Sequence, residues 1–263
     1  DIIILYISHK LHEVPQITDT ITVLRDGLFV GKVNTADVDR EEIIRMMFGE
    51  THIRKRPDDV LAQGRTVLEI KNLSSKNKFQ DISFKLQKGE ILGIAGMLGA
   101  GRTELLKSIF GADPYSSGEI YVNEKKAPRR ASPISMKKLG LGLTPENRKE
   151  EGLILIHSIR DNLCYASMDK TSRGWLENKP ERVAIADKQV EELSIKIPEI
   201  TAPVSSLSGG NQQKVVVGNW LNTQPKIMLY DEPTRGIDVS AKQQIFEIMW
   251  KQSRQGISII FVS

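Results

Sequence analysis

The fold of this chain is decided by the stretch Gly96-Met97-Leu98-Gly99-Ala100-Gly101-Arg102-Thr103. It follows an apolar run over residues 91–95, which predicts a short buried strand. After it, Leu105, Leu106 and Ile109 recur at helical spacing. A glycine-rich loop between a strand and a helix directs backbone N–H groups and a helix N-terminus at one point, which favours the binding of an anion.

This loop departs from the usual phosphate-binding pattern G-x-x-x-x-G-K-[ST] at one position. Arg102 stands where the pattern has lysine, and Thr103 stands where a hydroxyl would coordinate Mg²⁺. Arginine keeps the positive charge, but its planar guanidinium is bulkier and less adaptable than an ammonium group. Taken alone, the loop is therefore equally compatible with a glycine-rich turn that binds nothing.

A second motif places two carboxylates at the end of an apolar strand. Residues 226–230 are largely apolar and are followed by Asp231 and Glu232. Asp231 can hold Mg²⁺ through water, and Glu232 can polarise an attacking water molecule as a general base. By itself the pair is also compatible with an exposed acidic strand end.

A third motif opens a helix with a serine and two glycines. Ser208, Gly209 and Gly210 precede a helical pattern that runs to Leu221. A serine cap with glycines at a helix start predicts a second anion site, although an ordinary N-cap has the same appearance. All three motifs in this order and spacing argue against coincidence.

The two ends of the chain repeat each other. Residues 1–8 and residues 256–263 both predict a buried strand that ends in an aromatic residue, a β-branched residue and a serine. Two unrelated strands would explain this, but two homologous domains explain it better. Since the chain also starts at Asp1, we expect it to be a piece of a longer polypeptide.

Composition excludes several classes of protein. The 263 residues include 37 Lys and Arg against 33 Asp and Glu, and the net charge of +4 is too small for a protein that wraps nucleic acid. A hydrophobic content of 40% excludes disorder as the main state. The apolar runs are shorter than a membrane span. The single cysteine, Cys164, excludes a disulfide framework and fits a reducing cytosol.

The sequence before the glycine-rich loop predicts small elements on either side of a polar linker. In chain order they are a short helix over residues 10–19, a hairpin over 21–33, a helix over 39–48 begun by Asp39, a polar linker-like stretch over 49–59, and strands over 67–70 and 82–86.

At these motifs the chain resembles the ATP-binding cassette family. Gly96–Thr103 resembles its Walker A motif, Leu207–Gln213 its signature motif, Met228–Glu232 its Walker B motif and Gly236–Asp238 its D-loop. The amino-acid sequences of these motifs, together with Pro145–Lys149, are similar to those in the second cassette of bacterial importers of ribose, galactose, xylose and arabinose, in which two cassettes are fused.

The resemblance implies an α/β fold: a P-loop NTPase (RecA-like) core with an antiparallel β subdomain and an inserted α-helical subdomain at about residues 153–204. It further implies that residues 1–50 are the tail of the first cassette, 51–65 a linker and 66–263 the second cassette, which stops before its own switch residue. It leads us to expect an ATP-binding subunit that couples ATP binding and hydrolysis to monosaccharide import at the cytoplasmic face of the membrane.

The family's functional residues map onto this chain by motif. Catalytic roles are implied for Glu232, for His9 as the switch residue of the first cassette and for Glu146 at the Q-loop position. Thr103 and Asp231 would hold Mg²⁺. ATP would be bound by Gly96, Met97, Leu98, Gly99, Ala100, Gly101, Arg102, Thr103, Asp231, Ser208, Gly209, Gly210, Gln213 and Asp238. The implied partners are the first cassette, the membrane permease and, indirectly, a periplasmic or extracellular sugar-binding protein, but no nucleic acid.

Three departures from the family pattern keep two alternatives open. Arg102 replaces lysine, Glu146 stands where glutamine is usual, and Phe79 is a weak candidate for an adenine platform that is better explained as core. One alternative is a degenerate nucleotide-binding regulatory half with little hydrolysis. The other is a soluble cassette ATPase acting on ribosomes or DNA, against which the low net charge argues.

Overall fold

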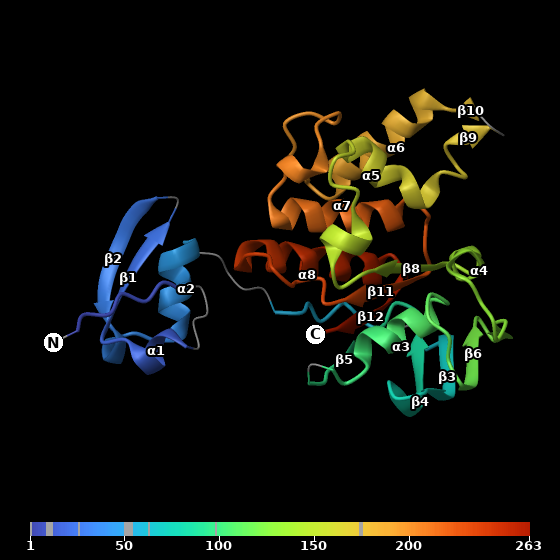
Figure 1. Cartoon of the computed structure of the whole chain (residues 1–263), viewed down its shortest axis with the longest axis horizontal. Helices are drawn as coiled ribbons and strands as arrows, with labels where there is room; N and C mark the ends of the chain where they lie inside the picture. The colour runs from blue at the N-terminus through green and yellow to red at the C-terminus, as the bar shows by residue number, and fades with distance from the viewer. Residues whose placement is uncertain are drawn as a thin grey trace. The chain divides into compact units, whose positions relative to one another are not determined.

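The computed structural model describes residues 2–8, 13–25, 27–49, 55–62, 64–97, 99–173 and 176–263. The chain divides into two compact units, residues 1–54 and 55–263, and the division falls inside the stretch predicted to be a linker (Figure 1). Among the helices of the described residues, none has the length and apolar character needed to traverse a bilayer.

The first unit is a small hairpin packed on helices. Strands β1 (Thr20–Arg25) and β2 (Leu28–Asn34) pair antiparallel, which confirms the predicted hairpin. Around it lie α1 (Val14–Ile17), a 3₁₀ turn (Thr35–Asp37) and α2 (Arg40–Phe48). As predicted, Asp39 begins α2, and its carboxylate accepts a hydrogen bond from the backbone N–H of Glu42 at 2.7 Å. The buried residues of this unit are Val14, Ile21, Val23, Ile43 and Ile44.

The strand predicted over the first residues of the chain is absent from the described structure. Residues 2–8 have no regular secondary structure, and the side chain of Ile3 is 97% exposed. The prediction was wrong because an all-apolar strand needs neighbouring strands on both edges and cover on both faces. The two-stranded antiparallel sheet of this unit offers neither.

The second unit is built on a four-stranded parallel sheet. Its order is β5 (Ile91–Ile94), β12 (Ser258–Val262), β11 (Ile227–Asp231) and β8 (Leu141–Thr144). Every residue of β11 is buried, as its apolar run predicts. The strand β5 is the outermost strand on one side of the sheet. Its residues are half-buried or exposed, so the prediction of a buried strand was wrong.

The side chains of β11 alternate between two cores. Ile227 and Leu229 face a core that contains α3 (Arg102–Ile109), whereas Met228 and Tyr230 face one that contains α7 (Gly209–Leu221) and α8 (Val239–Arg254). Helices therefore cover both faces of the sheet (Figure 1), which explains why β11 has no polar positions before Asp231.

An antiparallel sheet shares the core on the α3 side. It has the order β4 (Phe79–Gln87), β3 (Thr66–Ser75), β6 (Ser117–Val122) and β7 (Lys125–Lys126), and α4 (Pro133–Lys138) follows it in the chain. Phe79 packs against this core, which favours its interpretation as a packing residue.

A helical segment lies between β8 and β11 in the sequence. It contains a π-helical turn (Arg148–Gly152), α5 (Ile159–Cys164), a 3₁₀ turn (Tyr165–Ser167), the short hairpin β9 (Ser172–Arg173) with β10 (Leu176–Glu177), α6 (Lys179–Glu192), a second 3₁₀ turn (Val204–Ser206) and α7. The predicted α/β fold, with its parallel core, antiparallel sheet and helical insertion, is confirmed.

Truncating Leu106 should destabilise the second unit strongly. Its side chain is 0% exposed and lies in the core shared by the two sheets, so Leu106→Ala leaves a cavity. We expect a loss of about 2–5 kcal/mol in the free energy of unfolding, measured by urea denaturation. The matched change Leu61→Ala, at a side chain that is 68% exposed, should cost little; similar losses for both variants would contradict this packing.

Candidate functional site

The start of α3, which follows β5, and the end of β11 meet at the carboxyl ends of the strands of the parallel sheet. There the hydroxyl of Thr103 lies 3.1 Å from Oδ1 of Asp231 and 3.3 Å from Oε2 of Glu146. A threonine hydroxyl carries a single proton, so the two carboxylates share one donor. The structure thus brings together the two predicted magnesium ligands and the residue predicted at the Q-loop position.

Asp231 is buried, and its second carboxylate oxygen, Oδ2, has no hydrogen-bond partner among the described residues. Burial raises the pKa of Asp231 to about 6, against the opposing effect of the Thr103 hydrogen bond; the negative charges of Glu146 and Glu232 raise it further. An unpartnered carboxylate oxygen beside a hydroxyl is a suitable pair of ligands for Mg²⁺, which prefers oxygen and keeps several waters.

No cluster of three or more His, Cys, Asp or Glu side chains in the described part of the chain is arranged to hold a metal. Mg²⁺ at Thr103 and Asp231 would therefore need water or phosphate oxygens to complete its coordination. This is the usual pattern for Mg²⁺ at sites that bind nucleoside phosphates.

The glycine-rich loop depends on the absence of a side chain at Gly101. This residue precedes α3 with a φ of 80°, and a Cβ atom there would lie 2.2 Å from the carbonyl oxygen of Lys78. Any other residue would have to push the β3–β4 turn away from the loop. Of the predicted loop residues, Leu98 lies outside the described residues, and the exposed side chain of Met97 projects from the loop.

Arg102 does not point into open space. One of its guanidinium nitrogens, Nη2, lies 3.2 Å from Oε1 of Glu232, and both side chains are largely buried, at 13% and 23% exposure. Glu232 also has a left-handed backbone, with a φ of 43°, which is strained for a residue with a side chain. The residue that replaces the usual lysine is thus ion-paired with the predicted general base, a contact that sequence reasoning did not predict.

The start of α7 differs in detail from the expected serine cap. Ser208 occupies the N-cap position, but its side chain does not cap the helix; its hydroxyl accepts a hydrogen bond from Nδ2 of Asn211 at 3.1 Å. Ser208 is exposed, whereas Gln213 is buried, so the Gln213 side chain does not lie on the surface that Ser208 presents. Asp238 caps α8 through a 2.8 Å bond from the N–H of Ala241.

Two arginines complete the site, and neither was singled out from the sequence. Arg235 forms an ion pair with Glu146. Arg148 donates to the carbonyl oxygens of Arg235 and Gly236, at 2.7 and 3.1 Å. The available signals were that Arg148 lies within the Pro145–Lys149 stretch and that Arg235 directly precedes Gly236. His9, predicted as a switch residue, lies outside the described residues.

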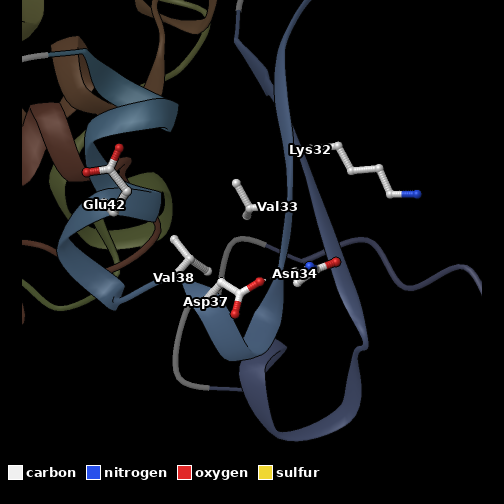
Figure 2. Close-up of a pocket in the computed structure, with 6 residues that line it drawn as sticks. All are labelled: Lys32, Val33, Asn34, Asp37, Val38 and Glu42. Carbon is white, nitrogen blue, oxygen red and sulfur yellow. Dashed lines mark hydrogen bonds between the residues drawn. The ribbon is translucent and has the colours of Figure 1, made fainter.

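A separate depression of about 440 Å³ lies in the first unit, lined by Lys32, Val33, Asn34, Asp37, Val38 and Glu42 (Figure 2). Asn34 donates to Asp37 at 2.9 Å, and Lys32 points away from the other polar side chains. Of the predicted site residues that the structure describes, none lines this depression. We therefore place the candidate site at the edge of the parallel sheet.

Replacing Asp231 with asparagine should make stability less dependent on pH. An ordinary aspartate has a pKa of 3.8, so a folded-state value of about 6 favours the folded protein below pH 3.8, and this contribution is lost as the pH rises through 6. At pH 7, Asp231→Asn should be the more stable form by roughly 3 kcal/mol at most. The difference in free energy of unfolding between Asp231→Asn and wild type should narrow as the pH falls from 6 to 4. It is measured by urea unfolding without Mg²⁺ or nucleotide.

The control Asp58→Asn changes an exposed carboxylate, and its free energy of unfolding should depend on pH as that of wild type does. If Asp231→Asn also keeps the wild-type pH profile, burial of Asp231 carries no cost.

Comparison with known proteins identifies the family of the chain. The family described as "ABC transporter" matches residues 79–235. The chain is 42% identical over 261 residues to the ribose import ATP-binding protein RbsA of Bacillus licheniformis, covering 99% of this chain and 52% of that protein. It is 40% identical over 261 residues to RbsA of Bacillus subtilis, again covering 99% and 52%. The chain therefore spans about half the length of the curated relatives it matches.

Solved structures show the same fold. A nucleotide-free ATP-binding cassette from an ABC transporter superposes with a TM-score of 0.66 at 21% identity, covering 75% of this chain and 81% of that one. A cassette bound to ADP and phosphate in a dimeric post-hydrolysis state gives 0.63 at 21% identity, covering 74% and 87%. At 21% identity the solved structures establish the fold alone, whereas the family match and the relatives at 40–42% identity establish family membership. The chain belongs to the ABC transporter family.

Proposed function

We propose that this chain is the ATP-binding part of a bacterial monosaccharide importer, where ATP binding and hydrolysis drive sugar uptake. The observation that carries the proposal is the convergence of Thr103, Asp231, Arg102 and Glu232 beside the glycine-rich loop. Relatives that match nearly the whole chain are named ribose import ATP-binding proteins, and these names support the substrate class.

The proposed roles follow from the chemistry of each group. Backbone N–H groups of residues 96–103 cradle the phosphates, and Arg102 adds a positive charge. Thr103 and Asp231 hold Mg²⁺, which when bound neutralises charge on the phosphate oxygens. Glu232 orients the attacking water and accepts its proton, in a reaction that depends mostly on positioning and charge stabilisation.

The start of α7 serves a second cassette in this proposal. Ser208, Gly209 and Gly210 contact the terminal phosphate of ATP bound to the partner cassette, and Asp238 lies at the junction between them. Residues 1–50 are the tail of the first cassette, with His9 as its switch residue, and residues 66–263 belong to the second. The relatives' length, about twice that of this chain, supports this arrangement. The polypeptide would bind its permease at the cytoplasmic face of the membrane.

The Arg102–Glu232 ion pair favours a second candidate function, a nucleotide-binding half that hydrolyses ATP poorly. The ion pair engages the Glu232 carboxylate that would otherwise face the attacking water. It also engages the charge that would otherwise meet phosphate. In this version ATP binding at residues 96–103 regulates the partner site, where turnover takes place.

Replacing Arg102 tests whether it binds phosphate. Arg102→Ala removes a charge-assisted contact and should weaken ATP binding by about 1.5–3 kcal/mol, measured by calorimetry with Mg²⁺ present. Arg102→Lys restores the usual residue and should recover most of that affinity. The exposed control Arg130→Ala should bind as wild type does. Equal affinity of Arg102→Ala and wild type would refute a phosphate contact.

Replacing Glu232 separates the two candidate functions. If Glu232 is the general base, Glu232→Gln should slow hydrolysis at this site by about 10²–10⁴-fold while ATP still binds. The measurement is single-turnover hydrolysis by the two-cassette polypeptide, in a background where the general base of the first cassette is also replaced. If the second site of wild type turns over ATP and Glu232→Gln does so at the same rate, Glu232 is excluded as the base. If the wild-type second site is already as slow as Glu232→Gln, the regulatory function is favoured.

A further inference from the structure

The segments that follow the neighbouring strands β8 and β11 each contribute an arginine that contacts the other segment. Strands β8 and β11 pair in parallel, with Thr144 opposite Tyr230, so the chain leaves both at the same edge. Arg148 then donates through Nη1 and Nη2 to the carbonyl oxygens of Arg235 and Gly236. In return, the guanidinium of Arg235 pairs with Glu146. The segments 146–148 and 235–236 are thus held as one unit.

The first turn of α7 lies directly against this tie. A Cβ atom on Gly209 would lie 2.8 Å from Nη2 of Arg148 and 3.1 Å from the carbonyl oxygen of Gly236. One residue further, a Cβ on Gly210 would lie 2.6 Å from Cβ of Ala241 in α8. The two glycines therefore allow the helix start to approach the Arg148 guanidinium and the loop it holds.

Arg148 is suited to hold the loop in a way that lysine is not. Its planar guanidinium reaches two successive carbonyl oxygens at once, whereas an ammonium group is a compact point charge. Partial burial lowers the pKa of Arg148, but arginine stays protonated, so the positive charge remains on the carbonyl oxygens. The Ser208 side chain does not cap α7, and the Arg148 guanidinium and the loop that it holds lie directly against Gly209 at the helix start.

We propose that Arg148 is a positioning residue for ATP hydrolysis, which sets the start of α7 by holding the 235–236 loop against Gly209. The inference rests on the proposed function, in which Ser208, Gly209 and Gly210 meet the terminal phosphate on the partner cassette. Arg148 itself touches no phosphate in this account. Its loss displaces the donors of α7, and small displacements of positioning groups slow a reaction steeply.

The test compares Arg148→Ala with the neighbouring control Lys149→Ala, which removes an exposed positive charge from the same turn. Both changes are made in the two-cassette polypeptide with its permease, and kcat is measured alongside the Kd for ATP. Arg148→Ala should lower kcat about 10- to 100-fold with a Kd within about twofold of wild type. Arg148→Lys should be intermediate, and Lys149→Ala should match wild type.

Two further readouts separate positioning from a general loss of structure. Guanidinium chloride at low millimolar concentration should restore part of kcat in Arg148→Ala and none in Glu232→Gln. Hydrogen exchange at the amides of residues 235–238 should quicken in Arg148→Ala alone.

A wild-type kcat in Arg148→Ala overturns the proposal, and so does a raised Kd at unchanged kcat, which would make Arg148 a phosphate ligand. If Arg148→Ala is unfolded, a wild-type kcat in the folded Arg148→Lys variant overturns it equally. A wild-type polypeptide that neither binds nor hydrolyses ATP would instead refute the proposed function.

Discussion

The hydrogen bond between Thr103 and Asp231 joins the start of α3, which follows β5, to the end of β11, and these two strands are not neighbours in the sheet. The strand β12 lies between β5 and β11, so the bond spans the width of β12 and depends on β12 pairing with both strands. Parallel strands present their carboxyl ends at one edge, and this edge is where such sheets bind ligands. The glycine-rich loop, the two carboxylates and the start of α7 all take their positions from that sheet.

At the carboxyl ends of the parallel strands, two of the three carboxylates of the site are paired with arginines. Glu146 is matched by Arg235, and Glu232 is matched by Arg102. Asp231 is buried, and among the residues that the structure describes only the hydroxyl of Thr103 hydrogen-bonds its side chain, at Oδ1, while Oδ2 has no partner. A buried carboxylate without a counter-charge is costly, and a bound cation would relieve that cost. The position that lacks a pair is therefore the one at which Mg²⁺ would bind.

Several elements of the second unit were predictable because local patterns fixed them. The glycine-rich loop between β5 and α3, the apolar strand ending at Asp231 and the helix after Gly210 all carry their periodicity in consecutive residues. The strand expected over residues 2–7 failed for the opposite reason. Its apolar run describes a strand that can be buried, but burial depends on partners that no local pattern specifies.

The sequence by itself determined which chemical groups the site contains: a phosphate-binding loop with arginine, a hydroxyl, paired carboxylates and a serine–glycine helix start. Only the tertiary structure decided how those groups are paired. Arg102 meets Glu232 across 130 positions of sequence, and Arg148 reaches the 235–236 loop across 87 and 88. Neither contact leaves a periodic signal, because an ion pair or a carbonyl contact depends on where two strands end in space.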